Sequence, residues 1–192
     1  MNAIKRRCLL LALGLAAGAQ SALAAPFFAQ HVHQGVTFQV ESPNNASINA
    51  VLLRAITAAG QFASVSAEAD GTLVDIEVDD LDANGYPEIY VFVQSVGSGS
   101  YGSLIAYASN RNKSITPIHL PDLSAKQASG YMGHDKFKIG EGKLLRRFPI
   151  YLPGDTNSRP TGGMRQIQYR LVAGEAGWLL KLDRAFNLPQ SP

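Results

Sequence analysis

Alternation of apolar and polar residues with a period of two is the feature that most constrains this chain. In segment 36–41, Val36, Phe38 and Val40 alternate with polar residues, and segments 73–79, 166–171 and 178–183 repeat the pattern. Successive side chains of a β-strand point to opposite faces of its sheet, so this alternation predicts strands with one buried face. In the second and fourth segments the residues expected to face a core are Val74, Ile76, Val78, Trp178, Leu180 and Leu182.

Short connections rich in Gly, Asn and Asp join these segments in order along the chain. Links of this length favour antiparallel hairpins, because a parallel crossover needs a longer connection. Segment 88–94 (EIYVFVQ) is almost continuously apolar, which is typical of a central strand covered on both sides. We therefore expect an all-β fold with two antiparallel four-stranded meanders, residues 73–118 and 136–183, packed together face to face. One or two additional N-terminal strands precede them.

Segment 48–59 (INAVLLRAITAA) is ambiguous between helix and strand. Its length and alanine content favour an amphipathic helix, whereas its β-branched residues and the surrounding all-β pattern favour a strand. We predict a strand here.

The first 24 residues have the features of a cleaved secretory signal peptide. Three basic residues near the start precede an apolar run, and Ala22 and Ala24 form an A-x-A cleavage pattern. Residues 25–192 then form one domain with no transmembrane segment, and we expect a periplasmic location. Because the leader holds the one Cys and three of the 17 basic residues, 14 basic and 15 acidic residues and no Cys remain. This balance argues against a nucleic-acid partner.

A glycine- and serine-rich segment, 96–102, follows the central strand. Its Gly97, Gly99 and Gly102 have G-x-G-x-x-G spacing, but the dinucleotide-binding fingerprint needs a following helix, and a strand-like run follows here. A plain hairpin connection explains the glycines but not Tyr101, a large ring among small residues. An aromatic residue flanked by Ser and Gly is typical of recognition loops. A structural role and a binding role are equally open.

A second polar cluster spans residues 80–88. Asp80, Asp82, Asn84 and Glu88 take positions 1, 3, 5 and 9 of a calcium-loop pattern, with glycine at position 6. The acidic residue of position 12 is missing, since Val91 stands there. Calcium is one interpretation, and a turn whose Asp and Asn side chains cap their own backbone is the favoured one.

The histidines and carboxylates of the chain allow three further interpretations. His31 and His33 share one face of an extended segment but are too few for a closed zinc site. His134 and Asp135, with an unidentified serine, leave a hydrolase open as an alternative, although no G-x-S-x-G elbow is present. We expect the four histidines to be surface or loop residues. Asp75, Glu77 and Asp79 are interpreted as a solvated strand face.

Several segments in order resemble the periplasmic inhibitors of invertebrate-type (i-type) lysozyme. Ser98-Gly99-Ser100-Tyr101 matches the S-G-x-Y motif of that family. The resemblance extends over about residues 70–183 through the stretches DLDANGYPEIYVFVQSVGSGSYGSLIAY, GYMGHDKF, LLRRFPIY, GDTNSRPTGG and LVAGEAGWLLKLD.

The resemblance implies a competitive protein inhibitor without enzyme activity or cofactor. Its S-G-x-Y loop would enter the active-site cleft of a host or environmental lysozyme and so protect cell-wall peptidoglycan. Tyr131, Arg146 and Arg147 are candidates for rim contacts. The alternative is a calcium-braced extracytoplasmic β module that binds glycan or a surface protein. Exposed sheet edges also leave a homodimer open.

Overall fold

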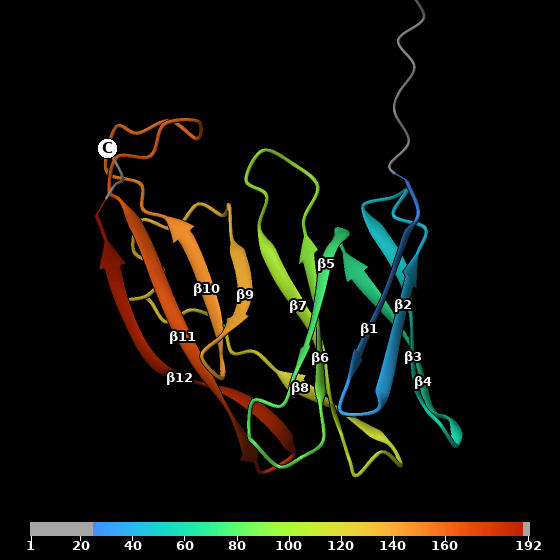
Figure 1. Ribbon diagram of the computed structural model, residues 1–192. Helices are drawn as coiled ribbons and strands as arrows, with labels where there is room; N and C mark the ends of the chain where they lie inside the picture. Colours follow the sequence, from blue (N-terminus) through green and yellow to red (C-terminus); the bar gives the residue numbers. More distant parts are fainter. Residues whose placement is uncertain (1–24, 190–192) are drawn as a thin grey trace, which may run out of the picture.

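Twelve β-strands in two sheets make up the computed structural model, which describes residues 25–189 (Figure 1). The predicted signal peptide, residues 1–24, lies outside the described residues. Within residues 25–189 no helix is long and apolar enough to cross a membrane. The strands are β1 (Phe27–His33), β2 (Val36–Ser42), β3 (Ile48–Thr57), β4 (Gly60–Asp70), β5 (Thr72–Asp79), β6 (Glu88–Gln94), β7 (Gly102–Ser109), β8 (Ile115–His119), β9 (Lys136–Gly140), β10 (Lys143–Pro149), β11 (Met164–Gly174) and β12 (Gly177–Leu188).

The N-terminal strands β1 to β4 form a separate antiparallel sheet in chain order. Segment 48–59 is confirmed as a strand, β3. The expectation of one or two N-terminal strands is too low, because there are four. Strand β4 was missed since it consists largely of Ala, Ser and Gly, and only Ala69 on it is buried. Strand β4 is also an edge of this sheet, and a homodimer through such an edge stays a prediction.

The two predicted meanders are confirmed as β5–β8 and β9–β12. They also join edge to edge into one curved eight-stranded sheet, because β8 and β12 pair in parallel where Ile118 lies opposite Trp178. At the other ends of this sheet, the backbone N–H of Ile139 on β9 donates to the Glu77 carboxylate on β5. Glu77 is therefore half-buried rather than on a solvated face, and burial raises the pKa of its carboxyl. Its side chain brings the two edges of the sheet together.

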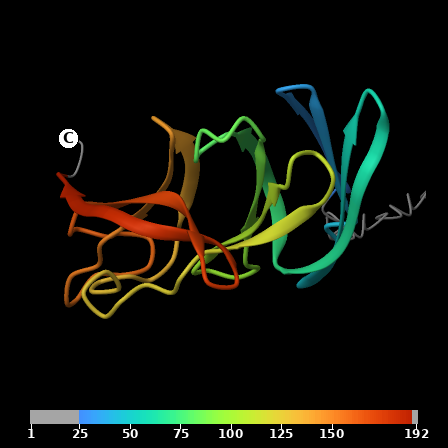
Figure 2. The ribbon, with the colours of Figure 1, turned by 90° about the horizontal axis from the view of Figure 1, so that it is seen from below.

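Strand β6 is the element shared by two hydrophobic cores, as the continuous apolar run of its sequence predicts. Its Ile89, Val91 and Val93 pack against the N-terminal sheet, whereas Tyr90 and Phe92 point into the core between the two meanders. The view from below shows the resulting succession of N-terminal sheet, first meander and second meander (Figure 2). The remaining residues of the second core include Ala106, Ala108, Leu144, Phe148, Ile167, Tyr169 and Leu180.

A β-bulge in β5 reverses one predicted side-chain direction. The pairing with β6 shifts between Leu73 and Asp75, so Leu73 is 3% exposed in the core while Val74 is 50% exposed. The Asn44 side chain holds this bulge, because its Nδ2 donates to the Leu73 carbonyl and its Oδ1 accepts from the Leu73 N–H, both at 2.9 Å. The alternation in the sequence carries no sign of the extra residue.

Candidate functional site

The loop between β6 and β7, residues 95–101, projects from one end of the first meander (Figure 1). Hydrogen bonds close its base, because Ser95 N donates to the Tyr101 carbonyl at 2.8 Å and Tyr101 N donates to Ser95 Oγ at 2.9 Å. Ser98 is exposed, and Tyr101 retains 49% of its accessible surface. Within residues 25–189 the Ser98 hydroxyl has no hydrogen-bond partner. The two motif side chains with functional groups are therefore accessible.

Glycines shape the inner side of this loop. A Cβ on Gly99 would lie 2.5 Å from the Tyr101 ring, so the ring packs directly over the glycine. Tyr131 also makes an edge contact with the Tyr101 ring, with ring centroids 5.6 Å apart. One part of the Tyr101 ring is thus held by the protein, and the rest faces solvent.

Two segments distant in sequence brace the loop through its main chain. The backbone N–H of His134 donates to the carbonyls of Gly99 and Ser100 at 2.8 and 3.1 Å. The Asn157 side chain donates to the Ser98 carbonyl at 2.6 Å, and its Oδ1 lies 3.0 Å from His134 Nε2. Sequence reasoning did not identify Asn157, and the only signal for it is the loop composition of the GDTNSRPTGG stretch. These contacts hold the loop in one conformation.

A buried polar network supports the loop from below. Asp135 accepts hydrogen bonds from Gly102 N at 2.8 Å, Tyr131 Oη at 2.5 Å and Arg146 Nε at 2.7 Å. Burial alone would lower the pKa of Arg146, but the charge of Asp135 outweighs that effect and raises it. Burial, followed by the hydrogen bond to Asp135, raises the pKa of the Tyr131 hydroxyl. The network fixes the first residue of β7 to the second meander.

The three residues predicted to make contacts around the binding loop lie in three different environments. Tyr131 lies beside the loop, as the contact with Tyr101 shows. Arg146 does not lie at a rim, because it is 7% exposed and forms an ion pair inside the core. Arg147 is exposed on β10 and its guanidinium donates to the Gln166 side chain. The adjacent Arg residues differ because strand neighbours point to opposite faces.

The arrangement of His134 and Asp135 does not support the hydrolase alternative. All three hydrogen bonds to Asp135 come from Gly102, Tyr131 and Arg146, and the His134 ring nitrogen instead faces Asn157. A Ser-His-Asp site requires the carboxylate to orient the imidazole and the imidazole to reach a serine. Within the described chain neither contact is present at His134.

The other histidines lie apart from the loop. His31 and His33 are on β1, and His33 Nε2 lies 3.9 Å from Asp79 Oδ1, while His119 ends β8 at the surface. A metal cluster needs at least three His, Cys, Asp or Glu side chains close together. Within the described residues, the one such group is Asp80, Asp82 and Glu88. Asp80 and Asp82 lie in the loop between β5 and β6, and Glu88 is the first residue of β6, at the opposite end of that strand from residues 95–101 (Figure 1).

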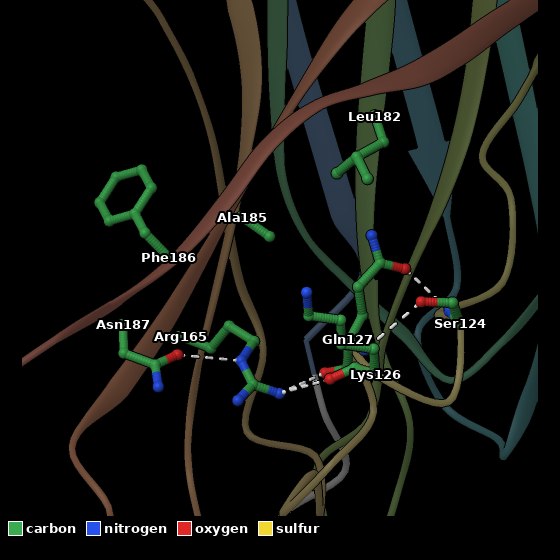
Figure 3. A pocket seen from close by; sticks show the side chains of 8 residues that line it. All are labelled: Ser124, Lys126, Gln127, Arg165, Leu182, Ala185, Phe186 and Asn187. Atoms are coloured by element: carbon green, nitrogen blue, oxygen red, sulfur yellow. Dashed lines mark hydrogen bonds between the residues drawn. The ribbon is translucent and has the colours of Figure 1, made fainter.

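A pocket of about 490 Å³ lies between the C-terminal half of β12 and residues 124–127 (Figure 3). The Arg165 guanidinium in its wall donates to the carbonyls of Lys126, Gln127 and Ser129, so its charge holds that segment onto β11. The pocket also explains why Leu182, predicted to be buried, is 44% exposed, since it lines this open wall. No residue of the predicted binding loop lines it.

No protein-family model and no curated protein matches the chain. A solved structure similar to it is that of Aeromonas hydrophila PliI in complex with Meretrix lusoria lysozyme, with 24% sequence identity and a TM-score of 0.41. The match covers 47% of this chain and 80% of that chain. In that structure PliI is bound to the lysozyme.

Proposed function

We propose that this protein is a competitive inhibitor of lysozyme, of the i-type in first place, and that residues 98–101 enter the substrate cleft of the enzyme. It acts in the periplasm after removal of residues 1–24, does no chemistry of its own, and protects peptidoglycan. The observation that carries the proposal is a braced loop that presents Ser98 and Tyr101 to solvent. The family resemblance of the S-G-x-Y motif supports the choice of partner.

The chemistry of a lysozyme cleft suits these two side chains. Such a cleft holds a carboxylic acid and a carboxylate on either side of a sugar-binding groove. The unpartnered Ser98 hydroxyl is able to donate a short, charge-assisted hydrogen bond to a carboxylate, as a sugar hydroxyl does. The Tyr101 ring supplies a flat apolar surface with a polar tip, which suits a sugar subsite. Inhibition then follows from exclusion of substrate.

The bracing contacts reduce the conformational entropy that the loop loses when it binds a partner. A segment that is disordered before binding loses backbone freedom worth about 1–2 kcal/mol per residue when it is fixed. Here the His134 N–H and the Asn157 amide already hold the carbonyls of Ser98, Gly99 and Ser100. The loop therefore retains more of its contact energy as affinity.

The test is inhibition of c-, g- and i-type lysozymes by the purified protein, followed through lysis of a cell-wall suspension. We expect Tyr101→Ala to weaken binding by at least about 2 kcal/mol, or roughly 30-fold, because a central aromatic anchor is lost. Ser98→Ala is expected to weaken inhibition without changing the melting temperature. The matched controls are Phe28→Ala and Ser64→Ala, which remove an exposed ring and an exposed hydroxyl from the N-terminal sheet. Unchanged inhibition by both loop variants would remove the loop from the mechanism.

A further inference from the structure

The loop between β5 and β6, residues 80–87, and the first residue of β6 bring three carboxylates close together. One oxygen from each of Asp80, Asp82 and Glu88 lies within 4.8 Å of the others. Calcium is bound by oxygen ligands at about 2.3–2.6 Å, so two ligands on opposite sides of one ion are at most about 4.6–5.2 Å apart. The separations of these oxygens fall within the span that ligands of one calcium ion can have.

Glu88 supplies an independent sign that a ligand belongs here. Its side chain is fully buried, and its Oε2 accepts from Leu81 N at 2.7 Å, with Tyr90 Oη at 3.5 Å. Its Oε1 is also buried and has no hydrogen-bond partner among the described residues. Buried polar atoms almost always have a partner, so the free oxygen requires an explanation.

A capping role explains only part of this arrangement. Asp80 accepts from the N–H groups of Asn84 and Gly85 at 3.0 and 2.7 Å, and Asp82 accepts from Asn84 N at 3.2 Å. These bonds account for the acidic residues of the turn, but not for a buried Glu88 directed at them. A carboxylate oxygen has two lone pairs, so each Asp can accept a backbone N–H and ligate a cation as well.

We propose that Asp80, Asp82 and Glu88 bind one calcium ion. Hard oxygen ligands at positions 1, 3 and 9 around a glycine turn favour calcium over transition metals. Calcium is favoured over magnesium because magnesium demands a near-ideal octahedron and retains its waters. The ion gives Glu88 Oε1 a partner and counters the mutual repulsion of the carboxylates. This site is independent of the lysozyme-binding loop.

A hydrogen bond also connects this site to the N-terminal sheet. Gln34, in the turn between β1 and β2, donates from Nε2 to Asp80 Oδ2 at 3.1 Å. The calcium-loaded hairpin would therefore be tied to the N-terminal sheet through the same carboxylate that ligates the ion. We expect calcium to stabilise the whole fold rather than the hairpin alone.

The test compares thermal unfolding and calorimetric titration of the metal-free protein with CaCl₂ and with MgCl₂. For a dissociation constant of roughly 10⁻⁴ M, about 5 mM calcium should raise the melting temperature by roughly 5 °C or more. Asp82→Asn keeps an acceptor for Asn84 N, and Glu88→Gln keeps an oxygen acceptor for Leu81 N, so both should fold while their calcium affinity falls at least about tenfold. Asp75→Asn, an exposed carboxylate on the neighbouring strand, is the matched control and should respond as the wild type does.

Three results would overturn the site. The first is a wild-type protein that shows neither heat of binding nor a change in melting temperature with calcium. The second is an equal response to magnesium. The third is an undiminished calcium response in both Asp82→Asn and Glu88→Gln. Because lysozyme inhibition is measured separately, a failure here leaves the proposed function untouched, and the reverse also holds.

Discussion

Replacing Asp135 by Asn should destabilise the protein by about 3–5 kcal/mol, because the change removes one charge of a buried ion pair. Asp135 and Arg146 are 5% and 7% exposed, and Arg146 Nε lies 2.7 Å from Asp135 Oδ1. The variant keeps the shape of the side chain, so the loss reports on charge and hydrogen bonding rather than on packing.

The magnitude follows from what surrounds the carboxylate. Oδ1 accepts from Arg146, and Oδ2 accepts from both Tyr131 and Gly102. In either orientation, the NH₂ group of the introduced asparagine would face at least one of these donors, and a buried unpaired donor costs about 1–3 kcal/mol. The guanidinium of Arg146 is in addition left buried without a counter-charge, which brings the sum into the range for a broken buried pair.

A double variant separates the charge effect from general disruption. In Asp135→Asn/Arg146→Met both charges are gone, and Met replaces a guanidinium that lies 5.3–5.7 Å from the ring centroids of Tyr131, Phe137 and Phe148. Methionine packs well against aromatic rings, and a buried ion pair is often replaced by apolar residues without loss. The double variant should therefore recover about 2 kcal/mol or more of the single variant's loss.

Urea unfolding measures these differences through the fluorescence of Trp178, the one Trp of the chain. The midpoint should fall clearly in Asp135→Asn and return part of the way in the double variant. A loss below about 1 kcal/mol in the single variant would show that the pair is not the buried, mutually dependent unit described here. A double variant less stable than the single one would lead to the same conclusion.

Two further substitutions test contacts with the main chain. One adds a methyl group at Gly133, and the other removes the Asn44 side chain. Gly133→Ala places a Cβ 2.0 Å from the Gly99 carbonyl oxygen, so the loop must move and lysozyme inhibition should weaken at least about tenfold in a lysis assay. Gly142→Ala, also at positive φ but with nothing within 4 Å, should leave inhibition unchanged, and equal effects of the two would contradict the reasoning. Asn44→Ala removes both hydrogen bonds to Leu73 and should cost about 1–3 kcal/mol in urea unfolding, whereas an unchanged midpoint would show that the bulge needs no such support.

The sequence was sufficient for most of the strand pattern and for the order of the hairpins. Strand β6 (Glu88–Gln94) has the predicted bounds, and its continuous apolar run reflects burial on both faces. The exposed position of the 95–101 loop also follows from local signals, because its glycines and serines interrupt two strands that pair with each other. Local periodicity is reliable where both partners of a hairpin are adjacent in the chain.

Features that depend on contacts between residues distant in the sequence could not be predicted from local periodicity. The outward turn of Val74 results from a bulge held by Asn44, and the inward position of Arg146 depends on Asp135. An Arg-Arg pair in a strand shows that one side chain faces inward, but a charged residue is normally assigned to the surface. Its burial becomes understandable only with the carboxylate of Asp135, at the end of the loop formed by residues 120–135.

The bracing of the 95–101 loop explains why residues that need not touch a partner can control binding. His134 and Asn157 come from two other loops, and they hold carbonyl groups of the S-G-x-Y segment rather than its side chains: two for His134 and one for Asn157. Main-chain acceptors leave the side chains of Ser98 and Tyr101 free for a ligand while the backbone stays ordered. Since ordering a flexible loop on binding reduces affinity, loss of either brace should weaken binding without any change in the contact surface itself. The exposed side chains would then determine specificity for a lysozyme cleft. The order that the neighbouring loops impose on the backbone would account for much of the affinity.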